Sequence, residues 1–182
     1  MKPHDVNTVL FTSEQIHRRV DKLAVEIANH LGRKEFAMVG VLRGSFIFLA
    51  DLVRALHRYD VHPLIDFMTL ESYGSGTISS GQVRVTKDIG MDVRGVEVLV
   101  VDDILDSGRT LSYARKHLLD LGAASVRICT LLDKPARRVV PMAADFKGFT
   151  VDDVFVVGYG LDYDNRYREL PYVAKVTFPE PE

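Results

Sequence analysis

The sequence predicts an α/β fold with a mostly parallel sheet flanked by helices. Stretches whose apolar residues recur every three or four positions alternate with short runs of consecutive apolar residues, the pattern of helices that alternate with buried strands. One such run, residues 98–101, is followed by Asp102 and Asp103, and then by Ser107 and Gly108 in front of the next helical stretch. Because open parallel sheets bind ligands at the carboxyl ends of their strands, we expect the functional site here.

The predicted elements follow one another in a regular order. The first helix begins after the capping sequence at residues 12–15, and its apolar residues recur at helical spacing until Gly32 ends it. The next elements are a strand at 36–42, a helix at 45–57, a strand at 64–70, a glycine- and serine-rich loop at 71–81, strands at 82–87 and 96–102, a helix at 110–121, and strands at 125–132 and 153–158. Since neither a repeat nor a linker interrupts this order, residues 1–182 are expected to form a single domain.

The composition excludes several classes of protein. A net charge of -2 argues against a general nucleic-acid binder, because such affinity comes largely from clustered Lys and Arg. No stretch approaches the roughly 18 apolar residues of a membrane helix, and the amino terminus lacks the pattern of a signal peptide, so we expect a cytoplasmic protein without membrane partners. The single cysteine, Cys129, cannot form an internal disulfide and lies in an apolar run typical of a buried thiol.

The segment after residue 101 combines acidic and anion-binding features. Free backbone N–H groups at Ser107 and Gly108, just before a helix, favour a phosphate, whereas carboxylates favour a divalent metal or sugar hydroxyls. A purely structural interpretation treats the acids as a strand end and a helix cap. Capping explains one acid but not three, so the sequence favours a phosphorylated substrate that carries a divalent metal.

Four motifs together resemble a known family. The sequence VVDDILDSGRT at residues 100–110 resembles the phosphoribosyl pyrophosphate signature of the type I phosphoribosyltransferases. The stretches VLRGS at 41–45, LLDKP at 131–135 and FVVGYGLDY at 155–163 resemble the hypoxanthine branch of that family, in the bacterial order and spacing. The resemblance implies a type I phosphoribosyltransferase fold with a small hood, and a flexible flap loop at about residues 71–81.

The resemblance also implies roles for individual residues. Asp106 would be the catalytic base that removes a proton from a purine nitrogen. The phosphoribosyl group would be bound by Asp102, Asp103, Asp106, Ser107, Gly108, Arg109 and Thr110. Pyrophosphate would be bound by Arg43, Gly44, Ser72, Tyr73 and Arg168, with the peptide bond before Arg43 in the cis form. The purine would be bound by Lys134, Phe155, Val156 and Asp162. Magnesium, the implied cofactor, would be bound by Asp102, Asp103 and Asp162.

Several of the site residues have competing interpretations, and Asp162 and Arg168 could also be a solvated acid and a surface arginine. Lys134 follows an apolar strand, where it could donate to the 6-oxo group of a purine or extend to solvent as an ordinary surface lysine. Phe155 could stack on the base or simply pack in the core. Residue type alone leaves the question open for Lys134 and favours a core position for Phe155, whereas the resemblance favours base binding for each.

The sequence therefore predicts a magnesium-dependent purine-salvage enzyme. It would form the nucleoside monophosphate and pyrophosphate from phosphoribosyl pyrophosphate and hypoxanthine, or guanine. The alternatives are a nucleotide-sensing regulatory protein with the same fold, and a receiver domain, although a receiver would place its acidic pair near the first strand. Relatives assemble as dimers or tetramers, so a homodimer or homotetramer is expected.

Overall fold

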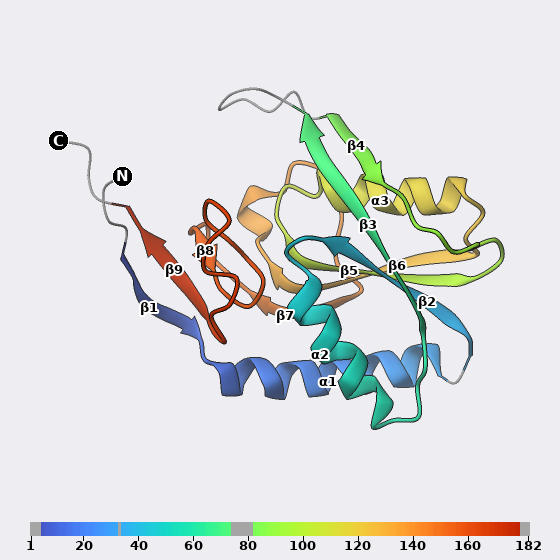
Figure 1. Ribbon diagram of the computed structural model, residues 1–182, viewed down its shortest axis with the longest axis horizontal. Coiled ribbons are helices and arrows are strands. Elements are labelled where there is room, and N and C mark those ends of the chain that lie inside the picture. Colours follow the sequence, from blue (N-terminus) through green and yellow to red (C-terminus); the bar gives the residue numbers. More distant parts are fainter. Residues whose placement is uncertain (1–4, 33, 74–81, 179–182) are drawn as a thin grey trace.

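The computed structural model describes residues 5–32, 34–73 and 82–178, and it contains a large sheet and a small one (Figure 1). The large sheet has the strand order β4-β3-β2-β5-β6-β7. Its strands are β2 (Phe36–Leu42), β3 (Leu64–Tyr73), β4 (Gln82–Lys87), β5 (Glu97–Leu105), β6 (Ser125–Asp133) and β7 (Phe146–Thr150). All neighbours in it are parallel except β3 and β4, which confirms the predicted mostly parallel sheet.

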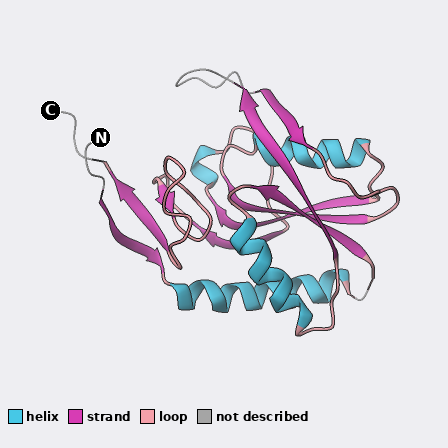
Figure 2. Ribbon diagram, viewed as in Figure 1, coloured by secondary structure: helices cyan, strands magenta, loops and turns pink. Residues whose placement is uncertain are grey.

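Helices cover both faces of the large sheet (Figure 2). They are α1 (Ser13–Leu31), α2 (Phe46–His57) and α3 (Arg109–Asp120), and a short 3₁₀ helix follows at Pro135–Arg137. The predicted capping of α1 is confirmed, because the Thr12 hydroxyl accepts from the N–H of Gln15 and the Gln15 side chain accepts from the N–H of Thr12. Within the described residues, no helix has the length and apolar character that crossing a membrane requires.

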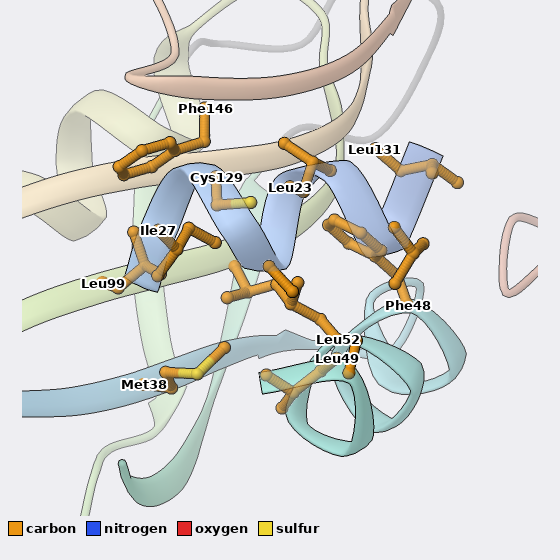
Figure 3. Close-up of a cluster of buried hydrophobic side chains, with 14 of the residues drawn as sticks. Leu23, Ile27, Met38, Phe48, Leu49, Leu52, Leu99, Cys129, Leu131 and Phe146 are labelled. Atoms are coloured by element: carbon orange, nitrogen blue, oxygen red, sulfur yellow. The ribbon is translucent and has the colours of Figure 1, made fainter. Parts of the chain in front are cut away.

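Successive residues of β5 point to opposite faces of the sheet and divide the core in two. Leu99 and Val101 join α1 and α2 in one buried cluster, together with Cys129, whose side chain is fully buried as predicted (Figure 3). Val98 and Val100 join α3 in the other cluster. Burial on both faces explains why these strands are continuous apolar runs in the sequence.

The small sheet has the order β1-β9-β8 and forms the hood that the resemblance implies (Figure 1). Its strands are β1 (Asp5–Phe11), β8 (Val156–Val157) and β9 (Val173–Thr177), and all are antiparallel. The strand predicted at 153–158 is present but shorter than predicted, since β8 spans only Val156–Val157, and it pairs with β9 in the small sheet. Strands β1, β7 and β9 were not predicted. Strands β1 and β9 pair with each other across the length of the chain, and β7 has only five residues.

Two strands run further than their patterns predict. Strand β5 continues through Asp102 and Asp103 to Leu105, because the pairing with β6 persists to the partner positions Leu105 and Asp133. Strand β3 continues to Tyr73, because its pairing with β4 extends from Thr69 to Tyr73. The acidic pair therefore lies inside β5, and the rest of the predicted flap loop, residues 74–81, lies outside the described residues.

Candidate active site at the carboxyl end of the sheet

The loop between β5 and α3 surrounds a hollow of about 290 Å³. The hollow is lined by residues of one continuous segment, namely Asp102 to Gly108, Thr110 and Leu111. Helix α3 begins with Gly108 as its N-cap, and the φ of Gly108 is 84°. A side chain there would be strained, and its Cβ would lie 2.9 Å from the carbonyl oxygen of Val140. The backbone therefore requires glycine at the predicted phosphate loop.

Arg109 differs from the other predicted members of this loop. Its backbone N–H lies beside the Ser107 hydroxyl at 3.4 Å, but its side chain does not line the hollow. Arg109 instead borders a separate hollow with Ser112 and Tyr113 on α3. Only the backbone of Arg109 thus belongs to the loop.

The acidic pair is destabilised in its charged form. Asp102 is 7% exposed, and burial together with the neighbouring charge of Asp103 raises its pKa well above the ordinary value. Burial also raises the pKa of Asp103, although the nearby Arg168 charge opposes that effect. A bound cation would favour both carboxylates, so this donor set is chemically suited to a divalent metal.

A second hollow, of about 550 Å³, lies where the β2–α2 loop meets the acidic pair. Its lining includes Arg43, Gly44, Asp103, Asp162 and Arg168, so Asp103 borders both hollows. The peptide bond between Leu42 and Arg43 is cis, as the resemblance implies.

Gly44 is the point where three segments meet. A Cβ at Gly44 would lie 1.6 Å from the Asp103 carboxylate, and a Cβ at Gly160 would lie 2.1 Å from the carbonyl oxygen of Gly44. The loop after β2, strand β5 and the hood segment therefore touch through glycines, which brings the predicted pyrophosphate residues to the acidic pair.

Asp162 and Arg168 form an ion pair in this second hollow, with 2.7 Å between a carboxylate oxygen and a guanidinium nitrogen. Arg168 also donates to the carbonyl oxygen of Gly160 at 2.6 Å, and the second Asp162 oxygen accepts from the N–H of Asn165 at 2.8 Å. In the described part of the chain, no three His, Cys, Asp or Glu residues gather closely enough to enclose a metal. The three predicted magnesium ligands thus form no complete protein cage.

Lys134 and Asp106 lie side by side at the ends of neighbouring strands, because Leu105 of β5 is paired with Asp133 of β6. Lys134 is only 4% exposed and its ammonium group donates to the carbonyl oxygen of Val154 at 2.8 Å. The interpretation of Lys134 as a surface lysine is therefore wrong. The ammonium group keeps two further N–H donors, and a buried cation with one neutral acceptor is costly without more partners.

The Asp106 carboxylate accepts no hydrogen bond from any described residue. One of its oxygens is shielded from solvent, and the nearest cation, the Nε of Arg137, lies 3.6 Å from that oxygen. The side chain as a whole is 39% exposed. The site therefore presents a carboxylate that accepts no hydrogen bond at the end of β5 and the buried Lys134 donor at the end of the adjacent strand β6.

Phe155 precedes the short strand β8 and is 43% exposed, so its ring is not a core residue. Tyr163 and Phe178 pack against it in T-shaped arrangements, with ring centroids 5.5 Å and 5.7 Å away. Val156 is buried in β8, opposite Lys175. A partly exposed aromatic ring that neighbouring rings hold in place is suited to stacking on a flat heterocycle.

Ser72 and Tyr73 end β3, where their backbones pair with Val83 and Gln82, and their side chains lie outside the described residues. Two residues near the site were not predicted to belong to it. Arg137 lies between the carboxylates of Asp106 and Asp153, and Arg138 contacts the loop backbone. The only signal in the sequence was their position three and four residues after Lys134.

Comparison with known proteins identifies the class. Residues 8–164 match the family model of the phosphoribosyl transferase domain, and the chain belongs to this family. The site just described therefore lies in a phosphoribosyltransferase fold.

Individual relatives narrow the class further. The chain is 44% identical over 174 residues to the hypoxanthine-guanine phosphoribosyltransferase of Bacillus subtilis, covering 96% of this chain and 95% of that protein. It is 46% identical over 170 residues to the hypoxanthine phosphoribosyltransferase of Escherichia coli K12, covering 92% and 94%. A crystal structure of a hypoxanthine phosphoribosyltransferase from Staphylococcus aureus matches with a TM-score of 0.89 and 39% identity, covering 95% of this chain and 92% of that one. These relatives belong to the branch that the four motifs indicate.

Proposed function

We propose that the chain catalyses purine salvage by transferring the phosphoribosyl group of phosphoribosyl pyrophosphate to hypoxanthine, and to guanine. The products are the nucleoside monophosphate and pyrophosphate. Family membership and the named relatives support the reaction class. The arrangement of donors and acceptors around Asp106 and Lys134 supports the choice of base.

The observation that carries this proposal is that the Asp106 carboxylate, which accepts no hydrogen bond from a described residue, and the buried donor Lys134 end adjacent strands. A 6-oxopurine presents a ring N–H and a carbonyl oxygen on the same edge. The Asp106 carboxylate is suited to the ring N–H and the Lys134 ammonium to the oxygen, since the two residues end adjacent strands. Adenine has an amino donor in place of that oxygen, and an ammonium group cannot accept from it.

The chemical step requires little from the protein beyond positioning and charge. As the bond to pyrophosphate breaks, positive charge develops on the ribose ring, and the purine nitrogen attacks the carbon that carried the leaving group. Asp106 is the proposed base that accepts the purine proton. Phe155 would stack on the purine, and the backbone beside Val156 would face its far edge.

The two phosphate-bearing ends of phosphoribosyl pyrophosphate are assigned to different hollows. The 5-phosphate is assigned to the smaller hollow, where Ser107, Gly108, Arg109 and Thr110 offer backbone N–H groups and hydroxyls at the start of α3. The pyrophosphate is assigned to the larger hollow, with Arg43, Gly44 and Arg168. The ribose hydroxyls would lie between them, against Asp102 and Asp103. The predicted pyrophosphate contacts of Ser72 and Tyr73 remain part of the proposal.

Magnesium is the proposed cofactor. Mg²⁺ is usually bound by one or two carboxylates together with substrate phosphates and water, so an incomplete protein cage is what it requires. Asp102 and Asp103 would hold it against the ribose and pyrophosphate, and Asp162 could contribute after exchanging its contact with Arg168. When bound, the ion would neutralise charge on the departing pyrophosphate.

A substrate panel tests the proposal. Purified protein is incubated with phosphoribosyl pyrophosphate, with or without magnesium, and with hypoxanthine, guanine, xanthine or adenine, and nucleotide is quantified by chromatography. We expect magnesium-dependent turnover of hypoxanthine and guanine and none of adenine. Absence of turnover with all four bases would refute the enzymatic function.

The Asp106→Asn variant tests the proposed base, because asparagine keeps the size of the side chain but cannot accept the proton. General-base catalysis typically contributes about 10²- to 10⁴-fold, and kcat should fall by a factor in this range. Binding of the nucleotide product should persist. Unchanged kcat would remove Asp106 from this role.

Several broader expectations are also proposed. Residues 1–182 would act as one domain, in the cytoplasm, with small-molecule substrates and neither nucleic-acid nor membrane partners. We propose a homodimer or homotetramer, which sedimentation equilibrium would distinguish from a monomer. In one structural relative, the hypoxanthine phosphoribosyltransferase of Trypanosoma cruzi, the C-terminal region has a role in the oligomeric state and enzymatic activity of that enzyme.

A further inference from the structure

The backbone carbonyl groups of residues 105–107, where β5 leads into the phosphate loop, all accept hydrogen bonds from one short segment, residues 138–140. The guanidinium group of Arg138 donates to the carbonyl oxygens of Leu105, at 2.9 Å, and of Asp106. The backbone N–H groups of Val139 and Val140 both donate to the carbonyl oxygen of Ser107, at 2.9 Å and 3.0 Å. We call residues 138–140 the carbonyl clamp.

The clamp determines where the loop N–H groups point. In a trans peptide unit, the carbonyl oxygen and the following N–H point in opposite directions. Because the clamp holds the carbonyls of residues 105, 106 and 107 on one side, the N–H groups of Asp106, Ser107 and Gly108 are directed to the other side. No described residue accepts a hydrogen bond from the N–H of Ser107 or Gly108, so these donors are available to a ligand.

Arg138 is itself held in place. Its side chain is only 14% exposed and forms an ion pair with Asp133, whose side chain is 10% exposed. Asp133 also pairs with Lys147 at 3.1 Å, but Lys147 is half exposed and contacts no loop carbonyl. The guanidinium group is planar and offers several donors in a fixed arrangement, which lets one side chain bind two carbonyls and a carboxylate together.

We propose that Arg138 is a positioning residue that preorganises the N–H groups of the loop for the 5-phosphate. This inference rests on the proposed function. It predicts that loss of Arg138 weakens binding of the phosphoribosyl group and leaves the apparent affinity for the base nearly unchanged.

The test compares Arg138→Met and Arg138→Lys with the matched control Lys147→Met, which removes the other cation from Asp133. Dissociation constants for ribose 5-phosphate are measured by calorimetry, and KM values for phosphoribosyl pyrophosphate and hypoxanthine are measured at saturating co-substrate. For Arg138→Met we expect the dissociation constant for ribose 5-phosphate and the KM for phosphoribosyl pyrophosphate to rise about 10- to 100-fold, because misplacement of the binding groups by about 1 Å has effects of this size. The KM for hypoxanthine should change less than about twofold.

The other two variants decide between positioning and general stabilisation. Lysine keeps the charge but cannot reach all three partners, so Arg138→Lys should show a smaller rise, and it carries the test alone if Arg138→Met does not fold. Lys147→Met should bind ribose 5-phosphate like the wild type. Wild-type affinity in both Arg138 variants, or an equal loss in Lys147→Met, would overturn the proposal. If the wild type turns over no purine but the binding differences are present, the proposed function fails and the clamp stands.

Discussion

Replacing Gly44 by alanine should disable the site by displacing Asp103. The added Cβ would lie 1.6 Å from one carboxylate oxygen and 2.5 Å from the carboxyl carbon of Asp103. The carboxylate would have to move back by roughly 1.4 Å before the contact reaches 3.0 Å, the shortest distance that Cβ atoms normally show. Misplacement by about 1 Å can reduce a rate about 100-fold, so we expect kcat/KM for phosphoribosyl pyrophosphate to fall by that factor, equivalent to about 2.7 kcal/mol.

Initial rates of nucleotide formation at varied phosphoribosyl pyrophosphate and fixed magnesium would measure this loss. Gly90→Ala is the matched control, because its Cβ would meet only an Asp66 oxygen at 3.8 Å, an ordinary contact. Circular dichroism would confirm that both variants are folded. A folded Gly44→Ala enzyme with kcat/KM within about threefold of the wild type would refute the reasoning that Gly44 is required by the position of Asp103.

Three further predictions concern a buried cation, a depressed pKa and a buried thiol. Lys134→Met should lower kcat/KM for hypoxanthine about 10- to 100-fold, since a hydrogen bond to a charged group contributes about 1.5–3 kcal/mol. The melting temperature should stay the same or rise, because the variant removes a buried charge. Activity equal to that of the wild type would contradict base binding by Lys134. Burial alone would raise the pKa of Asp66, but three backbone N–H donors hold it below its ordinary value of 3.8. This contribution to stability is present above pH 3.8 and is lost as the pH falls through the lowered pKa, so urea titrations of Asp66→Ala should show a deficit of about 1–3 kcal/mol at pH 7 that shrinks in acid. Burial raises the pKa of the Cys129 thiol, and a thiol reagent should label it only after unfolding; rapid labelling of the native protein would place it at the surface.

Local patterns predicted the elements that bury their own apolar residues. Helix α1 and strand β2 have the predicted limits almost to the residue, because helical spacing, a capping box and a continuous apolar run are all local signals. Strands β1 and β9 lack such signals. They form because Asp5–Phe11 meets Val173–Thr177, and no local pattern indicates a partner that far along the chain.

In the candidate site too, the features that depend on local sequence were predicted and those that depend on distant residues were not. The loop at Ser107 and Gly108 was located from sequence, because an anion-binding loop before a helix is a local arrangement. The burial of Lys134 and the contacts of Arg138 depend on residues 20 to 33 positions away, so residue type left the first undecided and gave no sign of the second. Motif resemblance supplied what the local pattern could not, namely which separate segments meet.

The hood has a consequence for how the chain acquires its activity during synthesis. Strand β9 is the central strand of the hood and pairs with both β1 and β8, yet it follows every other described element in the chain. The large sheet can assemble as the ribosome advances, because its strands lie between residues 36 and 150. Strands β1 and β8 gain their partner only when Val173–Thr177 has emerged. A nascent chain should therefore form its phosphate loop before it can hold Phe155 over a base, and activity should begin only after Val173–Thr177 has paired with β1 and β8.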